Sequence, residues 1–85
     1  SPMDVEMYEL VNNSSGYIGY FEGVTSGMQY RIDGGAWTDI PGAGRLSDNV
    51  WYVKAPGTYD FRNKGETDNT FWDEDHTLYA CIYRL

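Results

Sequence analysis

The sequence is poor in the residues that mark several large classes of protein. Its 85 residues include one cysteine, Cys81, so no disulfide can form within the chain. Six Lys and Arg stand against 13 Asp and Glu, a net charge of −7, whereas a nucleic-acid partner requires a basic stripe. An acidic surface also repels anionic lipid, and no apolar run reaches the roughly 18 residues of a membrane-spanning helix. We therefore expect neither nucleic acid nor a membrane as a partner.

Catalytic groups are also scarce. His76 is the single imidazole, and neither a Gly-x-Ser-x-Gly motif nor a metal-binding histidine pair accompanies it. Carboxylates are abundant, but a glycosidase needs two of them facing each other across a cleft, which a domain of this size can hardly enclose. The sequence therefore predicts a protein that is not an enzyme.

Helical periodicity is missing, because Gly, Pro, Asn or β-branched residues interrupt nearly every window that would carry it. Alternation is clear instead. Met28, Tyr30 and Ile32 share one face of a strand, and polar residues between them take the other. Gly34-Gly35 then supplies a turn tolerant of positive φ, with Asp33 as its cap. Seven strands are predicted, over residues 5–11, 17–23, 28–33, 36–40, 49–54, 58–63 and 77–85.

Short strands separated by Gly and Pro turns are typical of a small all-β fold, an antiparallel β-sandwich of about seven strands. A partly open β-barrel is the alternative. We expect one domain over residues 5–85, with residues 1–4 as the remnant of an expression tag or a disordered start. Because large aliphatic residues are few, the three Trp, eight Tyr and three Phe are expected to fill most of the core.

Two short motifs stand in the middle of the chain. One is a hairpin pattern and the other begins a strand: Gly27-Met28-x-Tyr30-x-x-Asp33-Gly34-Gly35-x-Trp37 and Gly57-Thr58-Tyr59. Over residues 23–69 the chain thus resembles the repeated modules of bacterial cell-surface and secreted multidomain proteins. The resemblance implies an Ig-like or fibronectin-like sandwich, an extracellular or cell-surface location, and neighbouring domains of the same chain as partners.

The loop over residues 66–76 departs from such modules, because it holds two adjacent aromatic residues, Phe71 and Trp72. Adjacent side chains outside an alternating strand cannot both point into one core. Trp72 is therefore a candidate to stack on a sugar ring, with Trp51 as a weaker helper. Two carboxylates beside it would accept hydrogen bonds from sugar hydroxyls, namely Asp73 and Asp75. The alternative is that Trp72 folds back over the open end of the sandwich.

The same loop gathers carboxylates whose hard oxygen atoms suit Ca²⁺. The candidate ligands are Asp68, Asp73 and Asp75. Their spacing does not match an EF-hand loop, so a solvated acidic loop without bound metal is the alternative. No other cofactor is expected.

These observations predict a non-catalytic Ig-like module of a bacterial surface or secreted protein. It would act in adhesion, with a surface protein as partner, or as a spacer that presents neighbouring domains. A carbohydrate-binding module that stacks a glycan on loop aromatic residues is the alternative. A further alternative is a structural module of a phage or other assembly that pairs through an exposed edge strand.

Overall fold

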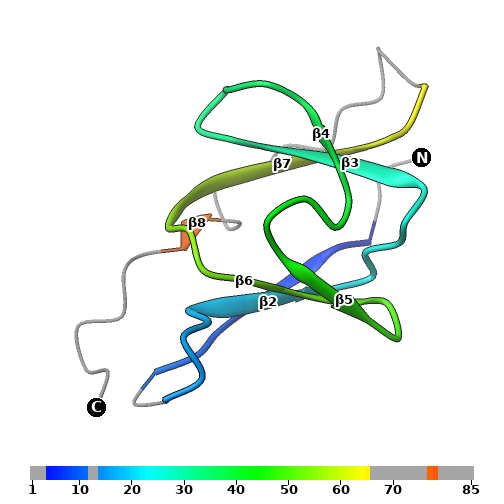
Figure 1. Cartoon of the computed structure of the whole chain (residues 1–85). Helices are drawn as coiled ribbons and strands as arrows, with labels where there is room; N and C mark the ends of the chain where they lie inside the picture. Colours follow the sequence, from blue (N-terminus) through cyan, green and yellow to red (C-terminus); the bar gives the residue numbers. More distant parts are fainter. Residues whose placement is uncertain (1–3, 12–13, 66–76, 79–85) are drawn as a thin grey trace.

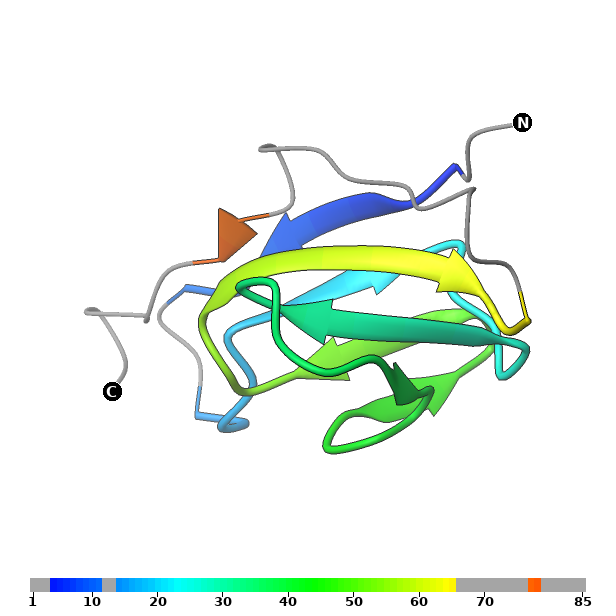
Figure 2. The same ribbon diagram turned by 90° about the horizontal axis from the view of Figure 1, so that it is seen from above.

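The computed structural model describes residues 4–11, 14–65 and 77–78, and these residues form strands and loops without a helix. The strands are β1 (Glu6–Glu9), β2 (Gly19–Glu22), β3 (Met28–Ile32), β4 (Thr38–Asp39), β5 (Arg45–Ser47), β6 (Val50–Val53), β7 (Gly57–Asn63) and β8 (Thr77–Leu78). They form two antiparallel four-stranded sheets, ordered β1-β2-β6-β5 and β4-β3-β7-β8. Figure 1 shows the sheets as two facing layers, and the view from above in Figure 2 shows the second sheet lying over the first. The predicted small β-sandwich is confirmed.

The order of the strands is that of an immunoglobulin-like sandwich. In the constant-type arrangement, strands A, B, E and D form one sheet and strands C, F and G the other. In chain order, β1-β2-β6-β5 corresponds to A-B-E-D and β3-β7-β8 to C-F-G, with β4 as an additional edge strand beside β3. The connection from β6 to β7, over residues 54–56, therefore crosses between the sheets.

The turn after β3 lies one residue earlier than the sequence predicts. The residues with positive φ are Asp33, at 53°, and Gly34, at 71°, and the Gly35 N–H donates to the Ile32 carbonyl at 2.9 Å. Positive φ at both central residues defines a type I′ turn, which Asp tolerates better than most residues. The Asp33 carboxylate accepts a hydrogen bond from the Thr58 N–H at 2.9 Å rather than capping its own turn.

The sequence pattern does not predict β5, which forms a tight hairpin with β6. Asp48 and Asn49 are its turn residues, with φ of 49° and 61°, and Ser47 pairs with Val50 across it. One apolar residue, Leu46, in a three-residue strand is too short an alternation to detect. The other strands are mostly shorter than predicted, and of the predicted strand over residues 77–85 only Thr77–Leu78 lies within the described residues.

The core lies between the two sheets and is built from residues that alternate inward. On the first sheet, Met7, Phe21 and Trp51 stand in one cross-strand row that ends at Leu46. On the second sheet, Tyr30 pairs with Phe61. Among the described residues, the buried apolar side chains are those of Val5, Ile18, Phe21, Val24, Met28, Tyr30, Ile40, Trp51, Val53, Tyr59, Phe61 and Leu78. Five aromatic rings thus form the centre of the core, as the shortage of aliphatic residues predicts.

Tyr59 occupies a position typical of immunoglobulin-like folds. It lies near the start of β7, just after the connection between the sheets, and its hydroxyl donates to the Ala55 carbonyl four residues earlier. This is the geometry of a tyrosine corner. The Gly57-Thr58-Tyr59 motif of the sequence is therefore the place where the chain enters the second sheet. Burial, together with Tyr30 and Asp33, raises the pKa of the Tyr59 hydroxyl well above its ordinary value of 10.0.

We expect Tyr59→Phe to lower the free energy of unfolding by about 1 kcal/mol near neutral pH, through the lost hydrogen bond. The raised pKa adds a pH dependence. The unfolded chain releases the Tyr59 proton above about pH 10 while the folded chain keeps it, so wild-type stability falls there by up to about 1.4 kcal/mol per pH unit from this group. The variant lacks this contribution, so the difference in the free energy of unfolding between wild type and Tyr59→Phe narrows as pH rises. Urea unfolding over the alkaline range measures it, with Tyr20→Phe as control. A gap that stays constant with pH would contradict the assignment.

Candidate functional site

The candidate site residues on the acidic loop lie outside the described residues. They are Asp68, Trp72, Asp73 and Asp75, so the glycan platform and the Ca²⁺ site built on them stay predictions. Trp51 is described: it is 1% exposed and its indole N–H donates to the Pro41 carbonyl at 3.0 Å. Elsewhere in the described part of the chain, no three His, Cys, Asp or Glu side chains gather closely enough to hold a metal ion.

A row of tyrosines crosses the outer face of the first sheet. Tyr8 on β1 stands opposite Tyr20 on β2, and Tyr20 stands opposite Tyr52 on β6. The same row continues to Arg45 on β5. These side chains point outward because their chain neighbours, Met7, Phe21 and Trp51, point into the core and successive residues of a strand alternate. We call Tyr8, Tyr20 and Tyr52 the tyrosine row.

The rings of the tyrosine row pack against one another. Tyr8 and Tyr20 are stacked, with centroids 5.1 Å apart and planes 15° apart. Tyr20 and Tyr52 are 5.4 Å apart and tilted by 40°, and Tyr17 extends the contact at 5.7 Å from Tyr52. Cross-strand aromatic pairs of this kind each stabilise a sheet by up to about 1 kcal/mol. The rings of the row therefore hold one another in place.

Two cations close one end of the row. The Arg45 guanidinium lies 4.9 Å from the Tyr52 ring centroid and 5.8 Å from that of Tyr17. The Lys54 ammonium lies 5.1 Å from the Tyr17 centroid. A cation over an aromatic ring face is attracted by the ring quadrupole, which orients both side chains without neutralising their charge. Arg45 and Lys54 together form the cationic end.

The opposite end of the row is acidic. The Tyr8 hydroxyl donates to the Glu6 carboxylate at 3.0 Å, and Glu6 pairs across the sheet with Glu22. The hydrogen bond to Glu6, followed by the negative charge of Glu22, raises the pKa of the Tyr8 hydroxyl. The outer face of the first sheet thus carries carboxylates on β1 and β2, and cations from Arg45 on β5 and from Lys54, which follows β6.

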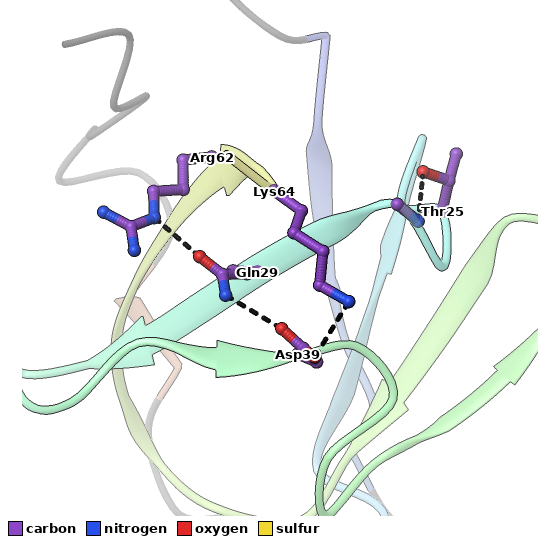
Figure 3. A network of polar contacts seen from close by, with 6 residues as sticks. Thr25, Gln29, Asp39, Arg62 and Lys64 are labelled. Atoms are coloured by element: carbon purple, nitrogen blue, oxygen red, sulfur yellow. Dashed lines mark hydrogen bonds and ion pairs between the residues drawn. The ribbon is translucent and has the colours of Figure 1, made fainter. Parts of the chain in front are cut away.

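The outer face of the second sheet has a different character, since it carries a network of polar side chains that hydrogen-bond to one another. In Figure 3 the Arg62 Nε donates to Gln29, whose amide donates to Asp39, and Lys64 pairs with the same carboxylate. The three donor to acceptor distances are 2.8, 2.8 and 2.9 Å. The Gln29 hydrogen bond and then Lys64 lower the pKa of Asp39. The side chains of this network therefore hydrogen-bond to one another, whereas those of the tyrosine row contact one another mainly through their rings.

Trp37 completes the outer face of the second sheet. Its ring lies 4.7 Å from the Arg31 guanidinium and 4.2 Å from that of Arg62. Trp37 is half-buried between these two cationic side chains and lies just before β4 rather than on a strand. Trp37 therefore serves as a matched aromatic control for the tyrosine row.

The sequence analysis missed the tyrosine row, although a signal was present. Three segments each contain two adjacent large apolar residues: Met7-Tyr8, Tyr20-Phe21 and Trp51-Tyr52. In a strand only one residue of such a pair can point into the core. Applied to these three pairs, the rule places one large apolar side chain of each on the outer surface, and at least two of the three are aromatic rings. The expectation that aromatic residues fill the core therefore does not hold for Tyr8, Tyr20 and Tyr52.

Comparisons with known protein families, with curated proteins and with solved structures found no match. Within the described residues, no helix has the length and apolar character needed to cross a bilayer.

Proposed function

We propose that this chain is a non-catalytic immunoglobulin-like module of a bacterial surface or secreted protein that acts in adhesion. The tyrosine row and its cationic end are the contact surface, and the partner is a protein. The observation that carries the proposal is the continuous register of Tyr8, Tyr20, Tyr52 and Arg45 across four strands. Tyrosine and arginine are enriched among the residues that dominate protein interfaces.

The packing of the rings favours a protein partner over a glycan. A sugar stacks through its C–H groups on an open ring face. Tyr20 has Tyr8 on one side and Tyr52 on the other, and Tyr52 has further contacts with Tyr17 and Arg45. The row therefore offers ring edges, hydroxyl groups and cations more than ring faces. Such groups suit the mixed apolar and hydrogen-bonding contacts of a protein interface.

The charge along the face supports a directional contact. The carboxylates Glu6 and Glu22 are on β1 and β2, whereas the cationic end comes from Arg45 on β5 and Lys54 after β6. Complementary charges on a partner would fix its orientation and speed its association more than they would raise its affinity. We expect the on-rate to fall as salt concentration rises.

The proposal is tested by binding of the immobilised protein to a panel of purified extracellular proteins and to a glycan array. We expect a protein ligand whose affinity falls about 30-fold in Tyr20→Thr, the loss of about 2 kcal/mol typical of a central interface tyrosine. Threonine keeps the strand propensity of the site. Trp37→Thr, which removes a ring packed against Arg31 and Arg62 of the second sheet, is the control and should bind like wild type.

The other outcomes separate the alternatives. Glycan binding that persists in Tyr20→Thr would favour the carbohydrate-binding function on a different surface. Binding of neither proteins nor glycans would favour the spacer function. Both outcomes contradict adhesion through the tyrosine row, provided that circular dichroism shows the variants to be folded.

A further inference from the structure

A cavity of about 170 Å³ lies between the two sheets, beside the connection from β6 to β7. Its floor consists of Tyr30, Trp51 and Tyr59, and its rim includes Ala43, Lys54 and Ala55. The three floor residues are buried, whereas the three rim residues are exposed. The cavity thus reaches from solvent to the aromatic centre of the core.

The floor presents carbon atoms to the cavity, because its polar atoms are engaged elsewhere. The Trp51 N–H donates to the Pro41 carbonyl, and the Tyr59 hydroxyl donates to the Ala55 carbonyl. The Tyr30 hydroxyl accepts from the Ala43 N–H at 3.3 Å. Water in such a space finds few hydrogen-bond partners, and dry apolar cavities of similar size, about 150 Å³, accept benzene.

The rings of the floor are arranged to receive another ring. Tyr30 and Trp51 have centroids 4.4 Å apart with planes tilted by 52°, and Trp51 and Tyr59 meet edge to face at 5.8 Å. Tilted rings expose both edges and faces to the space they enclose. A six-membered aromatic ring placed there gains edge-to-face contacts in addition to burial.

Small residues keep the mouth of the cavity open. Ala43 and Ala55 each have only a methyl side chain. Gly44, which also lines the cavity, cannot carry a side chain, because a Cβ there would lie 2.3 Å from the Trp51 Nε1. Longer side chains at either alanine would occupy the space. The opening therefore follows from particular residues rather than from loose packing of the whole core.

Lys54 gives the mouth a positive charge, and its ammonium also lies 5.1 Å from the Tyr17 ring centroid. Among the described residues that line the cavity it is the one charged side chain, and within this part of the chain it forms no salt bridge. Asp33 on the adjacent turn does not line the cavity, and its carboxylate accepts the Thr58 N–H. An occupant with a negative charge at one end would therefore be complementary to the mouth.

We propose that this cavity binds a small aromatic carboxylic acid. The ring occupies the aromatic floor, and the carboxylate pairs with the Lys54 ammonium at the mouth. The cavity itself lies between the sheets and its binding of a ligand does not depend on the adhesion proposal, but it shares Lys54 with the cationic end of the outer face.

The test is a titration of the protein with phenylpropionate, followed by two-dimensional NMR of the backbone amides. We expect progressive shifts at Ala43, Gly44 and Ala55 with a Kd on the order of millimolar, as for a weak ligand of about ten heavy atoms. The neutral alcohol phenylpropanol should bind about three-fold more weakly, the factor that an exposed ion pair supplies. The proposal would be overturned if the shifts were confined to other residues, or if no amide shifted up to the solubility limit of phenylpropionate.

Two pairs of variants separate the roles of charge and space. Lys54→Met should make the acid and the alcohol bind equally, while Lys64→Met, a lysine on the other sheet paired with Asp39, should keep the three-fold preference. Ala55→Leu should weaken both ligands at least ten-fold by filling the mouth, whereas Ala36→Leu on an exposed loop should not. If Ala55→Leu does not fold, Ala43→Leu makes the same test. Undiminished binding in a folded variant with a filled mouth would refute the assignment.

Discussion

Trp51→Ala is expected to lower the free energy of unfolding by about 3–5 kcal/mol, the loss typical of removing a large aromatic side chain from a core. The indole lies at the centre of the aromatic cluster: its ring centroid is 4.4 Å from that of Tyr30, 5.8 Å from Tyr59, 5.9 Å from Phe21 and 6.0 Å from Phe61. Small domains have total free energies of unfolding of about 5–15 kcal/mol, so this loss would remove a large fraction of the stability. Urea unfolding followed by circular dichroism measures the change.

Two controls isolate the cause. Trp51→Phe keeps a ring in the core but loses the hydrogen bond to the Pro41 carbonyl, so we expect a smaller loss of about 1–2 kcal/mol. Trp37→Ala removes a half-buried Trp held by two arginines and should cost about 1–2 kcal/mol. If Trp51→Ala were no more destabilising than Trp37→Ala, Trp51 would not hold the sheets together. That result would favour the sequence-based prediction that Trp51 helps to bind a glycan.

Arg31→Met is expected to lower the free energy of unfolding by about 3 kcal/mol, because it leaves a buried carboxylate without its counterion. The Arg31 Nε donates to the Asp60 Oδ2 at 2.7 Å, and the Asp60 side chain is 4% exposed against 31% for Arg31. The second carboxylate oxygen, Oδ1, has no hydrogen-bond partner among the described residues. Loss of Arg31 therefore leaves the Asp60 charge buried and unpaired, whereas loss of Asp60 leaves the Arg31 charge partly in contact with water.

A double-mutant cycle separates the cost of an orphaned charge from the value of the pair. We expect Arg31→Met combined with Asp60→Leu to recover to within about 1 kcal/mol of wild type, since buried ion pairs are often replaced by apolar residues at little cost. Lys64→Met breaks a pair whose side chains are both more than half exposed and should cost less than about 1 kcal/mol. A double variant as unstable as Arg31→Met would show that the pair itself, rather than the unpaired charge, supplies the stability.

The predicted strands succeeded where one face of a strand is buried and the other is polar. Met28 and Tyr30 alternate with Gln29 and Arg31, and the structure buries the first two between the sheets. Tyr59 and Phe61 are buried likewise. A period of two residues is a local property, so one strand displays it without reference to its partners.

Local pattern failed at the edges and turns. β5 has three residues, and its two-residue turn at Asp48 and Asn49 lacks the Gly that would mark it. The turn after β3 uses Asp33 and Gly34 rather than Gly34 and Gly35, because the Gly35 N–H bonds the Ile32 carbonyl and so fixes the register. Where several small or polar residues adjoin, more than one turn satisfies the backbone, and pairing of the strands selects among them.

Asp60 shows the limit of reasoning from alternation alone. It lies between Tyr59 and Phe61, so the pattern assigns it to a polar outer face, yet it is 3% exposed. Its carboxylate is compensated by Arg31, a residue on the neighbouring strand and 29 positions earlier in the chain. A local sequence pattern cannot predict this pair, because its two residues are 29 positions apart.

The sequence by itself determined the all-β class, the independence from internal disulfides, the aromatic nature of the core and the inward face of β3 and β7. Each of these depends on composition or on residues two apart, and such properties are present in the unfolded chain. The tertiary structure alone decided that Tyr8, Tyr20, Tyr52 and Arg45 form one row, that Arg31 meets Asp60, and that a cavity opens above Trp51. These features join residues far apart in the chain, and their meeting depends on the order and register of strands, which the packing of the complete sandwich selects.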